Sequence, residues 1–418
     1  MIYGKFYAGT FLFLVTLIVF QSCSDDGVTP VDGHVWGLVV NGNGNPIPDL
    51  VVKIGDQSTV TDRNGTYNLN DIETPYDVLI KDESSRSQML IKSVTSREIL
   101  VPDFLSSYNP DFKAYVNVNI PSSIIQSGKK GKLIFTDGGG VNSSTDITGE
   151  STILEVKLVY NSVQKGKLIV LIYSVDAAGR VYTYNNYASK TGIDLSNGST
   201  NNSFSFDMNE LSYNPPERII NGSINIPAGY NSSSQYYYLS FADRNISFND
   251  PSCKISDITG DNFNIVVPYD LPDIFSVMIN NYSNNSDKYS LETFVIHDYE
   301  SSVNLSSHHP VDLISPANNN SGITSNSEIS FSQGDGTGVY AVRFIKDGYM
   351  YSVITSETSF PISELEKFDI GNISNEHFTW TVQKYGHSSG LKEYLNIIPI
   401  SEVKFVSKSE QWMFQAAP

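Results

Sequence analysis

The sequence predicts an all-β protein, a tandem array of β-sandwich domains that follows an N-terminal export signal. Short apolar segments alternate with clusters of Gly, Asn, Asp, Ser and Pro through most of the 418 residues, a pattern typical of strands joined by tight turns. Hydrophobic residues make up 40% of the chain and aromatic residues 12%, which is enough to build packed cores. Because one sandwich takes about 100 residues, we expect four sandwich domains.

Residues 1–22 have the features of a cleaved export signal. The apolar segment Phe11–Phe20 is ten residues long, whereas a membrane-spanning helix needs about 20. A short apolar segment followed by a small residue, here Ser22, is typical of secretory signals. We therefore expect the mature chain to begin at the next residue.

The residues around this position resemble the lipobox of bacterial lipoproteins. Cys23 follows the small residue, although Phe20 stands where Leu is usual and Gln21 where a small residue is common. The resemblance implies that Cys23 carries the lipid and that residues 23–33 form a lipidated tether. Ser24–Asp26 resembles the acidic export signal of Bacteroidota-type outer-membrane lipoproteins, which implies display on the cell surface. The alternative is an ordinary cleaved signal followed by a chance cysteine.

The formal net charge of −18 narrows the possible partners. A surface this acidic repels phosphate backbones and anionic lipid headgroups, so we expect no binding to nucleic acid.

The chain has two cysteines. If Cys23 is acylated, Cys253 has no intrachain disulfide partner. We interpret Cys253 as a small buried side chain, and the alternatives are an intermolecular disulfide or a reactive thiol.

Residues 34–105 are expected to form the first sandwich. They contain an alternating strand at Val35–Val39, a strand introduced by proline at Pro46–Ile54, and a tight turn within Thr61–Tyr67. In that turn, Asp62 can accept hydrogen bonds from backbone amides. These elements resemble the carboxypeptidase-regulatory-like domain, a transthyretin-like sandwich of seven strands. The resemblance implies a module without catalytic activity.

The middle of the chain contains an internal duplication. Three short motifs recur in the same order and at nearly constant offsets. They are Val118–Pro121 with Ile224–Pro227, Asp146–Gly149 with Asp257–Gly260, and Asp194–Ser196 with Asn304–Ser306. A repeat near 100 residues is the size of one sandwich. We assign copy one to residues 106–212 and copy two to residues 213–306.

The last domain is assigned to residues 307–418. Asp347-Gly348 separates two apolar segments and suits a type I′ hairpin turn. Trp380 is expected to be the core aromatic residue, and residues 363–368 are expected to form a short helical turn. The segment resembles the fibronectin type III-like domains of cell-surface proteins, which share architecture more than residues.

Two groups of residues have the composition of metal sites. His297 and Glu300 have the H-x-x-E spacing of zinc carboxypeptidases, but zinc catalysis needs a third protein ligand. The corresponding strand of copy one reads Asn185-Asn186-Tyr187-Ala188, so we interpret the spacing as coincidence. Asp335 and the loop from Asp137 to Asp146 offer oxygen ligands without the spacing of a calcium loop, and we interpret them as solvated turns. We therefore expect no metal and no cofactor.

Tyrosine is the one enrichment that suggests a binding site. Tyr182 and Tyr184 are expected to share one face of a strand. Tyr236-Tyr237-Tyr238 is expected to open a strand in copy two, where Tyr236 and Tyr238 are the candidate binding residues. Exposed flat aromatic side chains can stack on sugar rings or bind proteins. Cross-strand packing is the alternative explanation for all four.

These features predict a non-catalytic, lipid-anchored protein of the outer membrane, facing the cell surface. Its sandwich modules would bind a glycan or protein ligand. A first alternative is a structural or assembly partner of an outer-membrane complex, and a less favoured one is a zinc-dependent hydrolase. The sequence does not predict the oligomeric state.

Overall fold

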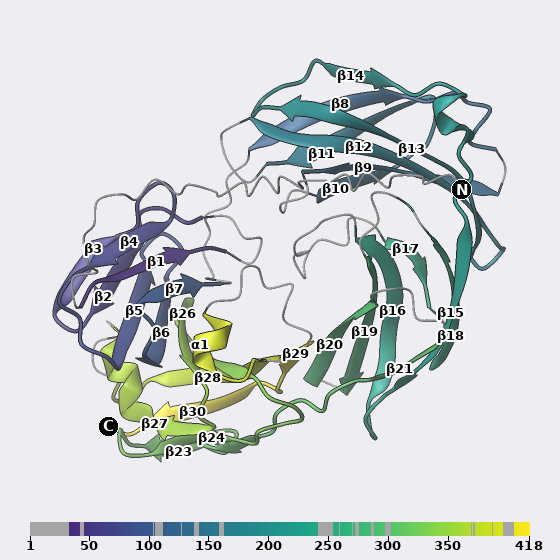
Figure 1. The fold of residues 1–418 in the computed structure, drawn as a ribbon. Helices are drawn as coiled ribbons and strands as arrows, with labels where there is room; N and C mark the ends of the chain where they lie inside the picture. The colour runs from purple at the N-terminus through teal and green to yellow at the C-terminus, as the bar shows by residue number, and fades with distance from the viewer. Residues whose placement is uncertain are drawn as a thin grey trace, which may run out of the picture.

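The computed structural model describes residues 33–41, 46–102, 104, 112–126, 128–137, 142–158, 163–240, 254–258, 260–269, 271, 276–285, 288–296, 302–368, 370, 373–386, 388–395 and 405–418. In these ranges almost all regular structure is β-strand, from β1 to β30 (Figure 1). The exceptions are the 3-10 turns η1 (Glu210–Ser212) and η2 (Ile362–Lys367) and the short helix α1 (Leu391–Tyr394). The predicted all-β sandwich fold is therefore confirmed. No helix in the described ranges is long and apolar enough to cross a membrane.

The N-terminal sandwich packs a sheet of order β4–β1–β7 against strands of order β3–β2–β5–β6. Its strands are β1 (Val35–Val39), β2 (Val51–Ile54), β3 (Gln57–Val60), β4 (Thr66–Leu69), β5 (Tyr76–Asp82), β6 (Ser87–Val94) and β7 (Glu98–Val101). The predicted turn before β4 is present, because Asp62 Oδ1 accepts hydrogen bonds from the amides of Asn64 at 2.8 Å and Thr66 at 2.9 Å. These bonds lower the pKa of Asp62.

Copy one has the strand orders β11–β8–β14 and β10–β9–β12–β13. Its strands are β8 (Lys113–Asn119), β9 (Lys129–Thr136), β10 (Asn142–Asp146), β11 (Ser151–Lys157), β12 (Gln164–Val175), β13 (Val181–Leu195) and β14 (Asn202–Ser205). Copy two has the orders β18–β15–β21 and β17–β16–β19–β20. Its strands are β15 (Glu217–Asn225), β16 (Asn231–Ser240), β17 (Lys254–Asp257), β18 (Asn262–Pro268), β19 (Ser276–Asn285), β20 (Lys288–Ile296) and β21 (Ser302–Ser306).

These three sandwiches share one topology. When the strands of each are counted from one to seven, one sheet has the order 4-1-7 and the other 3-2-5-6. Copies one and two also agree in detail, since the amides of Ile147 and Ile258 donate to the carbonyls of Gly131 and Gln235, both at 2.8 Å. The sequence motifs related only copies one and two. The strand order adds the N-terminal sandwich to the same group.

The C-terminal sandwich has a different strand order. The sheet β22–β24–β27 faces strands β26–β25–β28, which β29 and β30 extend. Its strands are β22 (Leu313–Ser315), β23 (Asn320–Ile323), β24 (Glu328–Phe331), β25 (Val339–Lys346), β26 (Tyr349–Thr355), β27 (Ser359–Pro361), β28 (His377–Gly386), β29 (Phe405–Lys408) and β30 (Trp412–Ala416). Trp380 has no exposed surface, as predicted for the core aromatic residue. Asp347 and Gly348 both have positive φ in the hairpin turn, also as predicted.

The C-terminal sandwich lies between the N-terminal sandwich and copy two (Figure 1). Strand β26 pairs in parallel with β6, from Met350 opposite Ser87 to Ile354 opposite Ile91. Strand β29 pairs with β20 on one side and β28 on the other. One sheet therefore runs through three sandwiches. In the N-terminal sandwich and copy two, it covers the edge of the sixth strand with backbone hydrogen bonds.

Candidate functional site

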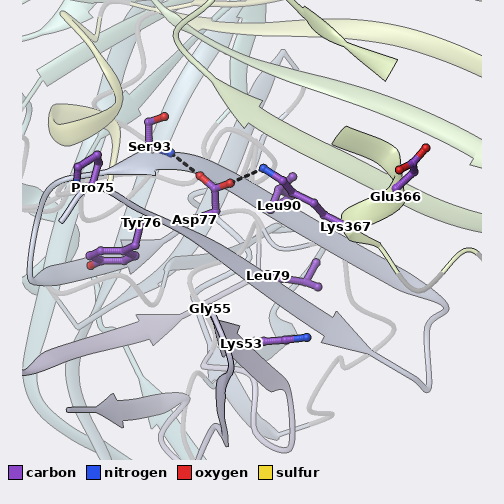
Figure 2. Close-up of a pocket in the computed structure, with 10 residues that line it drawn as sticks. All are labelled: Lys53, Gly55, Pro75, Tyr76, Asp77, Leu79, Leu90, Ser93, Glu366 and Lys367. Atoms are coloured by element: carbon purple, nitrogen blue, oxygen red, sulfur yellow. Dashed lines mark hydrogen bonds and ion pairs between the residues drawn. The ribbon is translucent and has the colours of Figure 1, made fainter. Parts of the chain in front are cut away.

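A cleft lies between the outer face of the N-terminal four-stranded sheet and turn η2 of the C-terminal sandwich (Figure 2). Its volume is about 700 Å³, within the range of small-molecule pockets. Both sandwiches contribute to its walls, so its shape depends on how they dock. The lining residues are Lys53, Gly55, Pro75, Tyr76, Asp77, Leu79, Leu90, Ser93, Glu366 and Lys367.

Asp77 lines the cleft, and two neighbouring groups bind its carboxylate. Figure 2 shows the Lys367 side chain and the Ser93 backbone amide on opposite sides of its carboxylate. Lys367 Nζ lies 2.7 Å from Oδ2, and the Ser93 amide donates to Oδ1 at 2.8 Å. The pairing of β5 with β6 shifts register between Tyr76 and Val78, opposite Ser93. This irregularity, with φ of 56° at Ser93, places that amide against Asp77.

The two charged groups stabilise each other's ionised forms. Burial raises the pKa of Asp77, but the hydrogen bonds from Lys367 and Ser93 outweigh it, so the pKa lies below its ordinary value. Burial lowers the pKa of Lys367, but its bonds to Asp77 and Glu364 outweigh it, so that pKa is raised. Asp77 is thus an ionised, already neutralised carboxylate, which is unsuited to accept a proton from a substrate.

The ion pair belongs to a network that crosses the domain boundary. Lys92 of β6 lies 3.5 Å from Glu364 and 3.7 Å from Glu357, and Glu364 also lies 2.8 Å from Lys367. Within the described ranges, the two lining residues Lys53 and Glu366 form no ion pair. The cleft therefore presents one available cation and one available anion beside a wall that contains Leu79 and Leu90.

The predicted binding tyrosines lie away from this cleft, near the junction of the two copies. Tyr182 is 57% exposed, whereas Tyr184 is completely buried. The Tyr184 hydroxyl lies 3.3 Å from that of Tyr237, and its ring lies 6.2 Å from Tyr173. Tyr236 is half-buried. The side chain of Tyr238 lies outside the described residues.

The prediction that Tyr182 and Tyr184 share one face is wrong. Tyr173 is opposite Tyr184 and Ser174 is opposite Thr183, but Val175 is opposite Val181. Tyr182 is thus the extra residue of a β-bulge, which turns its side chain out of the alternating pattern. No residue type at this position signals the bulge, so sequence alternation alone could not reveal it.

Several other predictions fall outside the described residues or on turns. Cys23, Cys253 and the H-x-x-E residues 297–300 lie outside the described ranges. Asp335 is in a loop, where its carboxylate accepts the His309 amide at 2.8 Å. Asp146 ends strand β10, so the prediction of a solvated turn there is wrong, and its carboxylate lies 2.8 Å from Lys132 of the neighbouring strand. Within the described ranges, no three His, Cys, Asp or Glu side chains come together as a metal site would require.

Sequence reasoning missed a buried lysine in the C-terminal sandwich. Lys384 has no exposed surface, and its Nζ donates to the carbonyls of Gln333, Asp335 and Gly336 at 2.7–2.8 Å. Burial lowers the pKa of Lys384 to about 8. The ammonium group holds the 333–336 loop against β28. The sequence signal for it is a lysine at a strand position where the alternation of apolar residues predicts a side chain that faces the core.

Comparison with known proteins yields only distant similarity, since neither a family model nor a curated protein matches this chain. Among solved structures, a DUF3823 family protein from Bacteroides uniformis is similar at 10% identity and a TM-score of 0.13, covering 39% of this chain and 98% of that one. The four N-terminal Ig domains of Dscam1 isoform 8.4 are similar at 9% identity and a TM-score of 0.15, covering 92% and 98%. TM-scores this low support no conclusion about function.

Proposed function

We propose that this chain is a lipid-anchored protein of a bacterial cell envelope that binds a ligand through its joined sandwiches and catalyses no reaction. The observation that carries the proposal is the sheet shared by three sandwiches. It fixes the walls of the cleft between the terminal sandwiches, and preformed walls reduce the entropy lost when a ligand binds.

A binding role fits the chemistry of the cleft better than catalysis. Asp77 is neutralised by Lys367, and the available side chains are Lys53 and Glu366, which sit on different domains. Such groups can orient a ligand that carries both charges. They offer no nucleophile that a neighbouring base activates.

The proposed anchor is the lipid on Cys23. Each buried methylene contributes about 0.8 kcal/mol, so two or more acyl chains hold a protein stably at a membrane. The acidic residues after Cys23, Ser24–Asp26, support outer-membrane display.

The experiment has two arms, one for the anchor and one for the cleft. Cells expressing the wild type should incorporate labelled palmitate into the protein, and external protease should remove it from intact cells. Cys23→Ala should abolish the label and release the protein from the membrane. Retention of membrane-bound protein in that variant would contradict the anchor.

For the cleft, the purified chain is tested against glycan and matrix-protein arrays. Lys53→Glu should weaken binding at least tenfold, whereas Lys130→Glu, at an exposed strand position in copy one, should not. Equal binding by both variants would place the ligand elsewhere.

A structural role in an outer-membrane complex is the second candidate. The outer face of the C-terminal sandwich carries an exposed apolar row, in which Ile345 is 45% and Met413 is 51% exposed. Both residues are cross-strand neighbours of Thr379. Exposed apolar groups in register favour a protein partner. Crosslinking in whole cells that yields one stoichiometric envelope partner would support this candidate.

A further inference from the structure

The docking of turn η2 on the N-terminal sheet leaves one carboxylate in the cleft between the terminal sandwiches. Two of the three charged side chains of η2 form ion pairs with the sheet, Glu364 with Lys92 at 3.5 Å and Lys367 with Asp77 at 2.7 Å. The third, Glu366, lines the cleft and forms no ion pair within the described ranges. Its charge is therefore not used in docking.

Lys53 provides the opposite charge from the N-terminal sheet. It is opposite Leu79 of β5, and Leu79 is opposite Leu90 of β6. The two leucines belong to the same buried apolar cluster as Leu365 of η2. Lys53 is thus one strand away from the apolar patch on which η2 sits. The cleft is lined by one unused charge from each sandwich, together with this patch (Figure 2).

A second lysine strengthens the positive charge at the Lys53 end. Lys81 lies two residues after Leu79 on β5, so both side chains face the same side of the sheet. Burial and the neighbouring charge of Lys53 lower the pKa of Lys81, although Glu83 opposes this effect. In a chain with a net charge of −18, most of the surface attracts cations. Two neighbouring lysines at a cleft therefore favour an anionic group on the ligand.

Among the described residues, Lys53 and Glu366 do not pair with each other, although both line the cleft and their charges are complementary. The volume of about 700 Å³ accommodates a drug-sized ligand, which is larger than one amino acid. A ligand with an ammonium group, a carboxylate and an apolar body complements both charges and the patch. Free peptides have these features, because both termini are charged at neutral pH. A fatty acid lacks the ammonium group, and a polyamine lacks the carboxylate.

We propose that the cleft between the terminal sandwiches binds a short apolar peptide with free termini. The peptide carboxylate pairs with Lys53 and its ammonium group pairs with Glu366. Its apolar side chains pack against the wall that contains Pro75 and Leu79. The inference rests on the proposed binding function and adds the class of ligand and its orientation.

The test starts with the purified full-length chain and a pool of free tripeptides built from alanine, valine, leucine and phenylalanine. Saturation-transfer NMR should identify at least one tripeptide that binds, and calorimetry gives its Kd. Laurate and spermidine, which each carry only one sign of charge, should bind about tenfold more weakly than this tripeptide.

Blocking one terminus at a time tests each contact. N-acetylation and C-amidation of the tripeptide should each raise the wild-type Kd about tenfold. Acetylation should cause no further loss in Glu366→Gln, and amidation none in Lys53→Met, because the contact is already missing. Glu328→Gln and Lys130→Met, at exposed strand positions elsewhere, should respond to blocking as the wild type does. All four variants should keep the wild-type Tm.

Four results would overturn the inference: no tripeptide binds, blocked and free tripeptides bind equally, the loss on acetylation persists in Glu366→Gln, or laurate or spermidine binds more tightly than every tripeptide. Lys53→Glu separates this inference from the proposed function. If that variant loses ligand binding on the arrays while no tripeptide binds, the peptide inference fails and the binding role stands. If the arrays reveal no ligand and no tripeptide binds, both fail.

Discussion

Asp77 and Lys367 join two sandwiches that are far apart in the sequence. Their ion pair spans the cleft wall, and the pKa of Asp77 is lowered because the hydrogen bonds it accepts outweigh the effect of burial. A carboxyl group whose pKa is lower in the folded state stabilises that state above its unfolded pKa. The stabilisation is lost as the pH falls through the folded value.

Asp77→Asn should therefore lower the free energy of unfolding most at neutral pH. The Asp77 side chain is 32% exposed, so the expected loss is about 1 kcal/mol or less. Urea unfolding from pH 7 to pH 3 should show the difference between variant and wild type shrinking below the ordinary aspartate pKa of 3.8. A difference that does not change with pH would contradict the ion pair.

Lys384 should contribute more to the free energy of unfolding than an exposed lysine does. Replacing it with methionine leaves three loop carbonyls without their donor, which should cost about 3 kcal/mol of unfolding free energy. Lys130→Met, at an exposed position on β9, should change it by less than about 0.5 kcal/mol. Similar urea midpoints for the two variants would count against the proposed role of Lys384.

Local chemistry at the residue scale was partly readable from the sequence. The Asp62 turn and the Asp347-Gly348 hairpin were predicted because their signals lie within a few residues. The exposed position of Tyr182 was not, because a bulge depends on the pairing of β12 with β13. The Asp77–Lys367 pair could not be predicted from the sequence either, since 290 residues separate its partners.

At the element scale, the short strand β29 connects two sandwiches. Its four residues, Phe405–Lys408, pair with both β20 and β28, so it joins copy two to the C-terminal sandwich. Hairpin pairs within a sandwich, such as β5 with β6, follow from short connections. Pairing between sandwiches, such as β26 with β6, has no such local signal.

Ser407→Pro should break this connection. Proline removes a backbone donor from a strand that is paired on both sides, and we expect a loss of about 2 kcal/mol or more. Hydrogen exchange should accelerate in Tyr289–Glu292 and Gln383–Gly386. Ser407→Val keeps the amide, and within the described ranges the Ser407 hydroxyl has no partner, so this control should exchange like the wild type. Unchanged protection in the proline variant would refute the pairing.

At the scale of the whole molecule, the sequence predicted four sandwiches in a row, and the structure joins three of them through one sheet. Repeated motifs related copies one and two because those motifs survive at turns and strand ends. The sequence did not reveal that the N-terminal sandwich has the same topology as copies one and two. Strand order constrains which positions are apolar but does not fix which apolar residue occupies each one.

The central claim is that one continuous sheet holds the N-terminal sandwich, the C-terminal sandwich and copy two in a fixed arrangement. One distance distribution tests it directly. Spin labels at Ser58 of β3 and Ser302 of β21, both exposed, would report on the N-terminal sandwich and copy two in a chain without its natural cysteines. Electron–electron resonance should give a single narrow distance in the parent chain and a broadened one after Ser407→Pro. A broad distribution in the parent chain would mean that the domains move independently, and the account would be wrong.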